Sequence, residues 1–405
     1  MKRTVLPNGL TVITEKNKGE AAVVLVSVAV GSYQETDRNA GIAHFLEHMI
    51  FEGTKKRKST YDVTWAIESL GGDVNAATDN EQTFYYAKVL KKDVNVALEV
   101  LSDMLINSTF KKEYVEKERK VIFNEAGMVT DDPKYYIWVL TQKHLFPDHP
   151  AGNILYGTQK SIKSITRNDI ANFHKKHYTA NNMTVVLVGD VEDATEKVRK
   201  YFKNTPTTQN KPKTIEPLKP LPKNRRYKTE KNIQQSYFTY SFRTVPRSHK
   251  DSYALDAVEA VLGRKQSGWI FDEVRGKRGL AYSCGVEHNT DPRTGSFSVY
   301  VNTEKQNWDK VRDLIDEQFR RLKKLTSKEL NESKRYILGE WILSHENPLR
   351  LAETLSFFHN SGNASEALNY TEKIKAVTLK DVQRVVQKYF DTEPVIVGIE
   401  QKTEN

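Results

Sequence analysis

The sequence contains very little cysteine and no long apolar run. Cys284 is the single cysteine, so the chain cannot form an internal disulfide, and a zinc site built from several cysteines is excluded. The longest apolar run, AAVVLVSVAV at 21–30, is too short to span a bilayer. The N-terminus, MKRTVLPNGLTVITEK, has no apolar core of a secretory signal. We therefore expect a soluble, cytoplasmic protein. A periplasmic or secreted protein whose signal had been removed would look the same.

The composition is that of a folded protein with a modest basic excess. Hydrophobic residues make up 38% of the chain, which excludes a disordered chain. The net charge is +10, and the basic residues are scattered apart from short clusters such as Lys55-Lys56-Arg57-Lys58. We interpret this excess as a solvated surface. Nucleic-acid binding is not supported, because no module combining aromatic and basic residues is present.

The patterns along the chain predict two similar halves. Strand-like and helical stretches alternate up to residue 205, and a segment with five prolines at 206–224 then reads as a linker. The end of the first half resembles the end of the second. ITRNDIANFHKKHY at 165–178, with the strand after it, is similar to VTLKDVQRVVQKYF at 377–390. We therefore predict two duplicated α+β domains, 1–205 and 225–405, each a mostly antiparallel sheet packed against helices.

The stretch AHFLEHMIFEGT at 43–54 carries the most informative pattern. In a helix, residues four apart share one face, so His44 and His48 should lie side by side with Glu47 on their flank. Two neutral imidazoles at this spacing can bind one zinc ion, and a nearby carboxylate can act on water there. The pattern H-x-x-E-H reverses the H-E-x-x-H of other zinc peptidases. By itself it also fits ordinary core or surface histidines, so a third ligand is needed.

The predicted helix at 112–129 offers two candidates for that ligand, Glu118 and Glu125. They are seven residues apart and therefore share one helix face. On a lysine-rich helix, such residues are usually exposed partners of nearby lysines. The helix nevertheless carries apolar residues, which indicate that part of it is buried: Val115, Val121, Ile122 and Phe123. A carboxylate near that side needs a partner.

Three stretches together resemble the inverzincin metallopeptidases of the pitrilysin type: AHFLEHMIFEGT, GGDVNAATDNEQTFY at 71–85 and ERKVIFNEAGMVTDDP at 118–133. That family includes insulin-degrading enzyme, the mitochondrial processing peptidase and small bacterial peptidases. The resemblance covers essentially the whole chain and implies a zinc-dependent endopeptidase or oligopeptidase. In the family the third ligand is a glutamate 77 residues after the second histidine, which is Glu125 here (125 − 48 = 77). Glu118 matches a second family glutamate that supports the site without binding metal.

The resemblance also implies substrate-binding residues. FDEVRGKRGLAYS at 271–283 carries Arg275 and Tyr282 at the spacing of a family pair that contacts substrate. Without the resemblance this segment would be interpreted as a basic turn, with Arg278 as a competing candidate. Asn75 and Ala76 match a family edge strand that pairs with the substrate backbone, although they would also fit a turn.

The mechanism that we expect follows from these assignments. One zinc ion per chain is bound by His44, His48 and Glu125, and Glu47 accepts a proton from the attacking water and returns it to the leaving amine. Arg275 and Tyr282 orient the substrate and stabilise the carbonyl oxygen. A site of two histidines and a glutamate can also accept Co²⁺ or Mn²⁺, so the metal used in the cell stays open.

The assembly is implied by the family as well. Its members close two pairs of domains around a chamber, and one chain of this length supplies one pair. We therefore expect a homodimer that acts on short or unfolded peptides, with the Arg275–Tyr282 pair serving the same or the partner's zinc site. Two alternatives are a catalytic subunit paired with a paralogue and a non-catalytic structural core-type subunit.

Overall fold

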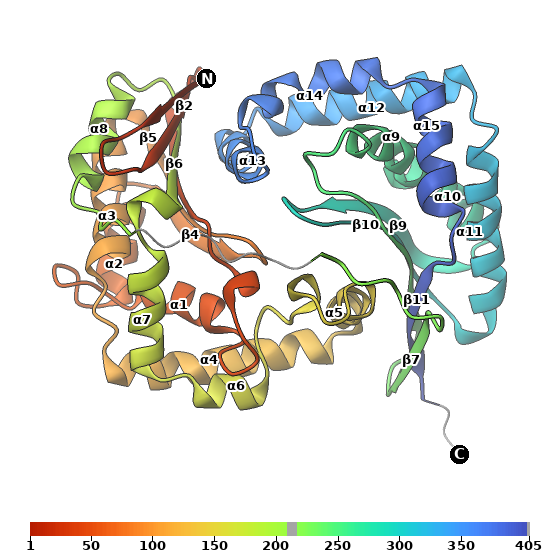
Figure 1. Ribbon diagram of the computed structural model, residues 1–405, viewed down its shortest axis with the longest axis horizontal. Coiled ribbons are helices and arrows are strands. Elements are labelled where there is room, and N and C mark those ends of the chain that lie inside the picture. The colour runs from red at the N-terminus through yellow and green to blue at the C-terminus, as the bar shows by residue number, and fades with distance from the viewer. Residues whose placement is uncertain (209–216, 403–405) are drawn as a thin grey trace. The chain divides into compact units, whose positions relative to one another are not determined.

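A computed structural model describes residues 1–208 and 217–402 and divides them into two compact units (Figure 1). Unit 1 contains residues 1–127, 153–208 and 344–360, and unit 2 contains residues 128–152, 217–343 and 361–402. Residues 209–216 of the predicted 206–224 linker lie outside the described residues. No helix in the described part of the chain is long and apolar enough to cross a membrane.

Unit 1 is built on a six-stranded sheet. Its strand order is β1-β2-β6-β3-β5-β4, in which β2 and β6 are parallel and the other pairs are antiparallel. The strands are β1 Lys2–Val5, β2 Thr11–Glu15, β3 Ala21–Val28, β4 Asp73–Thr78, β5 Thr83–Leu90 and β6 Met183–Val188. The helices are α1 Ile42–Phe51, α2 Thr60–Glu68, α3 Val94–Asn107, α6 Gln159–Ser164, α7 Arg167–His177, α8 Ala194–Phe202 and α13 Pro348–Asn360, with most of α4 Lys112–Asp131.

The central strand β3 explains how this sheet is covered. It is almost continuously apolar, and all but its first residue are buried, as expected for a strand with both faces covered. The helices α1 and α3 pack on one face, and Val24 and Val26 belong to the core that they form with the sheet. The helix α13 packs on β3 and β6 from the other face. This arrangement holds α1 firmly against the sheet next to the edge strand β4.

Unit 2 repeats this architecture with five strands. Its order is β7-β11-β8-β10-β9, and β7 and β11 form its one parallel pair. The strands are β7 Arg226–Lys231, β8 Ser236–Arg243, β9 Ala281–Thr290, β10 Gly295–Thr303 and β11 Val395–Gln401. The helices are α5 Pro133–Leu145, α9 Ser252–Gly263, α10 Trp269–Phe271, α11 Trp308–Leu322, α12 Ser327–Ser344, α14 Ser365–Ala376 and α15 Leu379–Val385. The fold is therefore α+β with two mostly antiparallel sheets, which confirms the predicted fold class.

The two sheets match strand by strand once β1 is set aside. In chain order, β2, β3, β4, β5 and β6 take the places that β7, β8, β9, β10 and β11 take in unit 2. The helices that precede β6 and β11 also begin alike. The side chains of Thr166 and Thr378 accept hydrogen bonds from the backbone N–H groups of Asp169 and Asp381. In return, the aspartate carboxylates accept hydrogen bonds from the backbone N–H groups of the two threonines. The sequence echo between the halves thus corresponds to equivalent helix starts.

The compact units depart from the predicted domains 1–205 and 225–405 at two helices. The helix α5, from the first half of the chain, packs on β8 and β11 of unit 2, and α13, from the second half, packs on the sheet of unit 1. Each is the helix that directly follows a long one, α4 or α12. The halves therefore exchange equivalent helices, which a division made at the proline-rich segment cannot detect.

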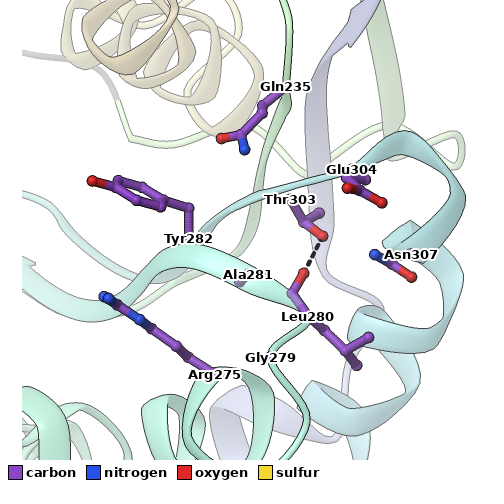
Figure 2. Close-up of a pocket in the computed structure, with 9 residues that line it drawn as sticks. All are labelled: Gln235, Arg275, Gly279, Leu280, Ala281, Tyr282, Thr303, Glu304 and Asn307. Carbon is purple, nitrogen blue, oxygen red and sulfur yellow. Dashed lines mark hydrogen bonds between the residues drawn. The ribbon is translucent and has the colours of Figure 1, made fainter.

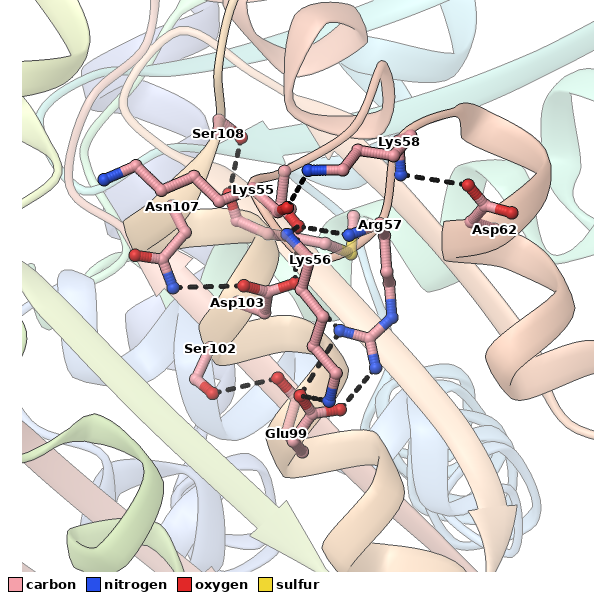
Figure 3. Close-up of polar contacts among 12 residues, drawn as sticks. Lys55, Lys56, Arg57, Lys58, Asp62, Glu99, Ser102, Asp103, Asn107 and Ser108 are labelled. Carbon is pink, nitrogen blue, oxygen red and sulfur yellow. Dashed lines mark hydrogen bonds and ion pairs between the residues drawn. The ribbon is translucent and has the colours of Figure 1, made fainter.

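The basic segment 55–58 is only partly a solvated surface. The Arg57 side chain is buried and forms ion pairs with Glu99 and with Asp103, where the Nη1–Oδ2 distance is 2.8 Å (Figure 3). The Thr54 hydroxyl donates to the same oxygen of Asp103 at 2.6 Å. A buried charge requires such partners, so Arg57 fastens the loop after α1 to α3. Our interpretation of the basic excess as a solvated surface therefore does not hold for Arg57.

Candidate active site

The helix α1 presents the predicted zinc-binding motif as expected. Gly41, at its N-terminus, has a φ of 90°, a left-handed conformation that favours glycine. The buried carboxylate of Glu35 accepts hydrogen bonds from the backbone N–H groups of Gly41 and Ala43 at 2.8 and 2.9 Å. It therefore satisfies donors that a helix start leaves without partners. Burial raises the pKa of Glu35 to about 7, although these two hydrogen bonds oppose the rise.

The structure brings His44, His48 and Glu125 together. Their ligand atoms all lie within 4.8 Å of one another. Oε2 of Glu125, from α4, is 3.7 Å from Nε2 of His44 and 3.4 Å from Nε2 of His48. Ligand atoms bonded to one tetrahedral zinc ion at about 2.0–2.1 Å are roughly 3.4 Å apart. Two imidazole nitrogens and a carboxylate oxygen at these distances fit a zinc ion.

The two histidines differ in their proton affinity. Burial, together with the nearby His48, lowers the pKa of His44 to about 3, so its imidazole is neutral and can act as a ligand. Burial lowers the pKa of His48 as well, but hydrogen bonding to Glu118 and the charges of Glu125 and Glu47 outweigh it and raise the pKa. Binding of a metal requires the neutral form of His48, so zinc binding at this site is coupled to release of a proton.

Glu118 contacts the ring of His48 at Nδ1, the nitrogen that does not face the other two ligands. Its Oε2 lies 3.0 Å from Nδ1 of His48, while Nε2 of the same ring faces Glu125. A carboxylate at Nδ1 fixes the tautomer that leaves Nε2 for a metal. The other oxygen of Glu118 lies 3.3 Å from Nζ of Lys117, which also reaches Glu52 at 2.8 Å. Glu52 is buried and ends α1.

Glu47 lies on the same face of α1 as the two histidines and is held by a hydroxyl. Oγ1 of Thr78, the last residue of β4, donates to Oε2 of Glu47 at 2.5 Å. Burial raises the pKa of Glu47, although the hydrogen bond from Thr78 and the charge of His48 oppose the rise. A carboxylate with a raised pKa is a better proton acceptor near neutral pH than an ordinary one.

A second group of possible ligands lies in unit 2 but is already neutralised by the protein. Asp256, Glu259 and His288 bring ligand atoms within 4.8 Å of one another. Nη1 of the buried Arg247 lies 2.9 Å from Oδ2 of Asp256, which also accepts a hydrogen bond from the Tyr370 hydroxyl at 2.9 Å. Oδ1 of Asp256 contacts Nδ1 of His288 at 2.7 Å. The guanidinium thus supplies the positive charge that a metal would bring.

Arg275 and Tyr282 lie close together in unit 2, each at an irregularity of the backbone. Arg275 belongs to a π-helical turn, Asp272–Gly276, and such turns recur at functional sites. Tyr282 is an extra residue in β9, because Ala281 and Ser283 pair with consecutive residues of β10, and a β-bulge of this kind redirects a side chain. Tyr282 is 70% exposed, and the centre of its ring lies 5.7 Å from the Arg275 guanidinium carbon.

The neighbouring cations are occupied elsewhere. Arg278 and Lys277 form ion pairs with Glu273, and Lys277 also pairs with Asp272 at 2.8 Å. Within the described residues, the Arg275 guanidinium forms no ion pair and lies over the rings of Phe271 and Tyr282. Arg275, unlike Arg278, is therefore available to a ligand.

Asn75 and Ala76 lie in β4, at the edge of the first sheet. Within the described residues β4 pairs only with β5, so its other side is open to an added strand. Oδ1 of Asn75 accepts a hydrogen bond from the Ala76 N–H at 2.8 Å. An incoming peptide that used this N–H would have to displace the Asn75 side chain.

Four residues of this site were not predicted from the sequence: Glu35, Glu52, Thr78 and Lys117. Each touches the site through the backbone of α1 or through another side chain, and the contacts of Thr78 with Glu47 and of Lys117 with Glu52 join residues far apart in the sequence. Glu52 and Thr78 lie within the stretches 43–54 and 71–85 that carried the family resemblance, which was the available pointer. No pattern in the sequence singles out Glu35 or Lys117.

Comparison with known proteins gives a consistent picture. Residues 11–159 match the family model described as insulinase, peptidase family M16, and residues 164–337 match the model described as the peptidase M16 inactive domain. An uncharacterized zinc protease of Bacillus subtilis is 32% identical over 351 residues, which cover 86% of this chain and 85% of the relative. The beta subunit of the mitochondrial-processing peptidase of Dictyostelium discoideum is 28% identical over 419 residues, which cover 98% and 88% of the two chains.

A solved structure agrees with the fold. The crystal structure of a protease from Helicobacter pylori superposes with a TM-score of 0.91 at 24% sequence identity, and the match covers 98% of this chain and 99% of that chain. This likeness extends over both units.

Proposed function

Because this chain belongs to peptidase family M16 and is a zinc metallopeptidase, we propose that it cleaves short or unfolded peptides as an endopeptidase or oligopeptidase. The observation that carries the proposal is that the ligand atoms of His44, His48 and Glu125 lie within 4.8 Å of one another, beside the half-buried carboxylate of Glu47. Such a donor set with a nearby proton acceptor is the arrangement that hydrolysis of an amide bond requires.

In this proposal His44, His48 and Glu125 hold the zinc ion, and Glu118 fixes the ring of His48. When bound, zinc polarises the peptide carbonyl and makes water a better nucleophile near neutral pH. Glu47 accepts the proton of the attacking water and delivers it to the leaving amine. The raised pKa of Glu47 suits both transfers, and the Thr78 hydroxyl keeps the carboxylate in place.

The remaining predicted residues bind the substrate. The exposed groups of Arg275 and Tyr282 donate hydrogen bonds to the peptide and stabilise the carbonyl oxygen as charge develops on it. The open edge of β4, at Asn75 and Ala76, pairs with the peptide backbone, which accounts for tolerance of varied side chains.

The proposal is tested by hydrolysis of a quenched, unstructured peptide before and after chelation, with stoichiometric zinc added back. We expect the activity to disappear on chelation and to return with zinc. Activity that persists in fully metal-free protein would refute the zinc mechanism. Absence of hydrolysis in every metal state would favour a non-catalytic subunit.

We also propose that the active form is a homodimer enclosing a chamber. The support is that one chain supplies two units of matching strand order and carries both the zinc motif and the Arg275–Tyr282 pair. The relative from Dictyostelium discoideum is named as one subunit of a processing peptidase, which favours a heterodimer with a paralogue as the second candidate. A purified chain that hydrolyses peptides without any partner would exclude that second candidate.

A further inference from the structure

A pocket in unit 2 extends from the Arg275–Tyr282 pair toward the start of α11. It has a volume of about 440 Å³, and Leu280, Glu304 and Asn307 are among the other residues that line it. Figure 2 shows the Arg275 guanidinium on one side of Leu280 and the side chains of Glu304 and Asn307 on the other. The pocket therefore has a cation at one end and an anion at the other.

The anionic end has no cation of its own. Glu304 is exposed, and its contact within the described chain is the Gln306 amide, which donates to Oε2 at 2.7 Å. The adjacent cation, Lys305, lies 3.4 Å from Glu400 instead. An exposed carboxylate at the wall of a pocket, without an ion-pair partner in the described structure, can receive a cation from a ligand.

The cationic end is equally open, and its guanidinium lies over the rings of Phe271 and Tyr282. The described structure contains no ion pair of Arg275 with any carboxylate, Glu304 included, because the neighbouring acidic residues Asp272 and Glu273 are paired with Lys277 and Arg278. A ligand that fills the pocket must therefore present an oxygen acceptor to Arg275 and a cation to Glu304. A peptide segment with a carbonyl oxygen near a lysine or arginine side chain has this pattern.

We propose that this pocket is a subsite for a basic side chain of the substrate peptide, with Glu304 as the residue that selects the charge. The inference rests on the proposed peptidase function and adds a preference to it. The methylene stem of a lysine or arginine lies along Leu280 and Ala281, and its charged head reaches Glu304 and the amide oxygen of Asn307. Glu304 repels an acidic side chain. A neutral side chain gains only the apolar contact with Leu280 and Ala281.

The test compares peptides that differ at a single position. Lysine, norleucine and glutamate are placed in turn at each position within four residues of the scissile bond of one quenched peptide. The kcat/KM values are measured for the zinc-loaded chain, for Glu304→Gln and for Glu317→Gln. Glu317 is a matched control because it is an exposed glutamate of α11 for which the described structure gives no ion pair.

At one position we expect lysine to be preferred over norleucine by about two- to fivefold, the range of an exposed ion pair. The preference disappears in Glu304→Gln, persists in Glu317→Gln and weakens as the salt concentration rises. Absence of a lysine preference at every position, or an unchanged preference in Glu304→Gln, overturns the proposal.

Failure of the proposed function is distinguished from failure of this subsite by a binding measurement. The Glu47→Gln variant, with and without Glu304→Gln, is titrated with the same peptides carrying a fluorescent label. If no peptide is cleaved but lysine still binds more tightly in a Glu304-dependent way, the subsite stands while the hydrolytic function fails. Equal affinities for the lysine and norleucine peptides refute the subsite whether or not hydrolysis occurs.

Discussion

At the scale of single residues, Lys117 shows how the site depends on a side chain that never touches the predicted ligands. Its ammonium lies between Glu52 at 2.8 Å and Glu118 at 3.3 Å, and Glu118 in turn holds His48. The positive charge keeps Glu118 ionised: burial opposes this, but His48 and Lys117 together lower its pKa. Lys117 therefore positions the carboxylate that orients a zinc ligand.

We predict that Lys117→Met weakens zinc binding by about three- to tenfold. Loss of a group that directly orients a ligand costs 10–100-fold, and Lys117 acts one contact further away. Zinc dissociation constants from competition with a chelator provide the measurement. Lys117→Arg should retain most of the affinity, and Lys120→Met, on the same helix, serves as the control. Equal zinc affinities for Lys117→Met and Lys120→Met would contradict this role.

Arg57 is buried although the lysines next to it in the sequence suggest an exposed segment. Three lysines surround it in the sequence, yet it is buried against Glu99 and Asp103. We predict that Arg57→Met lowers the free energy of unfolding by about 3 kcal/mol, because Asp103 is left buried without its partner. Urea unfolding measures this loss. The control Lys55→Met should change the free energy by less than about 0.5 kcal/mol, and similar losses in both variants would refute the distinction.

At the scale of elements, the start of α1 is hydrogen-bonded to the carboxylate of Glu35, and the pKa of this carboxylate changes on folding. Burial raises the pKa of Glu35 from 4.5 to about 7, so the folded chain holds this proton more tightly than the unfolded chain. The stability contributed by this proton is present below about pH 4.5 and is lost as the pH rises to about 7. The full difference corresponds to about 3 kcal/mol.

We therefore predict that the unfolding free energy of the metal-free chain falls between pH 5 and pH 7, by at most about 3 kcal/mol from this group. Glu35→Gln should remove that part of the fall. Urea unfolding at several pH values in this window, for both chains, gives the comparison. Parallel pH profiles for the two chains would show that Glu35 does not titrate in this way.

The elements were largely predictable from local patterns. From the sequence, 83–90 and 295–303 are predicted as strands and 252–263 as a helix, and these ranges are those of β5, β10 and α9. The π-helical turn at 272–276 and the bulge at Tyr282 were not predicted, because such irregularities arise from how neighbouring elements pack and leave no periodic pattern. The pairing of His44, His48 and Glu125 depended on family resemblance, since spacing alone cannot join α1 to α4.

At the scale of the whole molecule, the two units share one strand order but carry different predicted residues. Unit 1 holds the zinc motif, and unit 2 holds Arg275 and Tyr282. The exchange of α5 and α13 between the halves was invisible to a division at the proline-rich segment, because a helix that packs on a distant sheet has the same amphipathic pattern as one that packs nearby.

The predicted homodimer leads to a complementation experiment. Two inactive variants, Glu47→Gln and Arg275→Ala, are mixed under conditions that allow exchange of subunits. If the Arg275–Tyr282 pair serves the partner's zinc site, mixed dimers contain one intact site, and about a quarter to a half of the wild-type activity should return. Hydrolysis of the quenched peptide measures it. A mixture no more active than its components would show that the pair acts within its own chain or that no dimer forms.

The most direct test of the account is a paired measurement on Glu47→Gln and the unchanged chain: zinc per chain by elemental analysis, and the rate of peptide hydrolysis. We predict one zinc per chain in both proteins, because Glu47 is not a ligand and Arg247 already neutralises the group around Asp256. The rate should fall by at least about 100-fold in the variant, the lower range for loss of a general base. Unchanged hydrolysis in Glu47→Gln would contradict the central claim, that Glu47 accepts the proton of the attacking water. Loss of zinc along with activity would contradict the claim that Glu47 is not a zinc ligand.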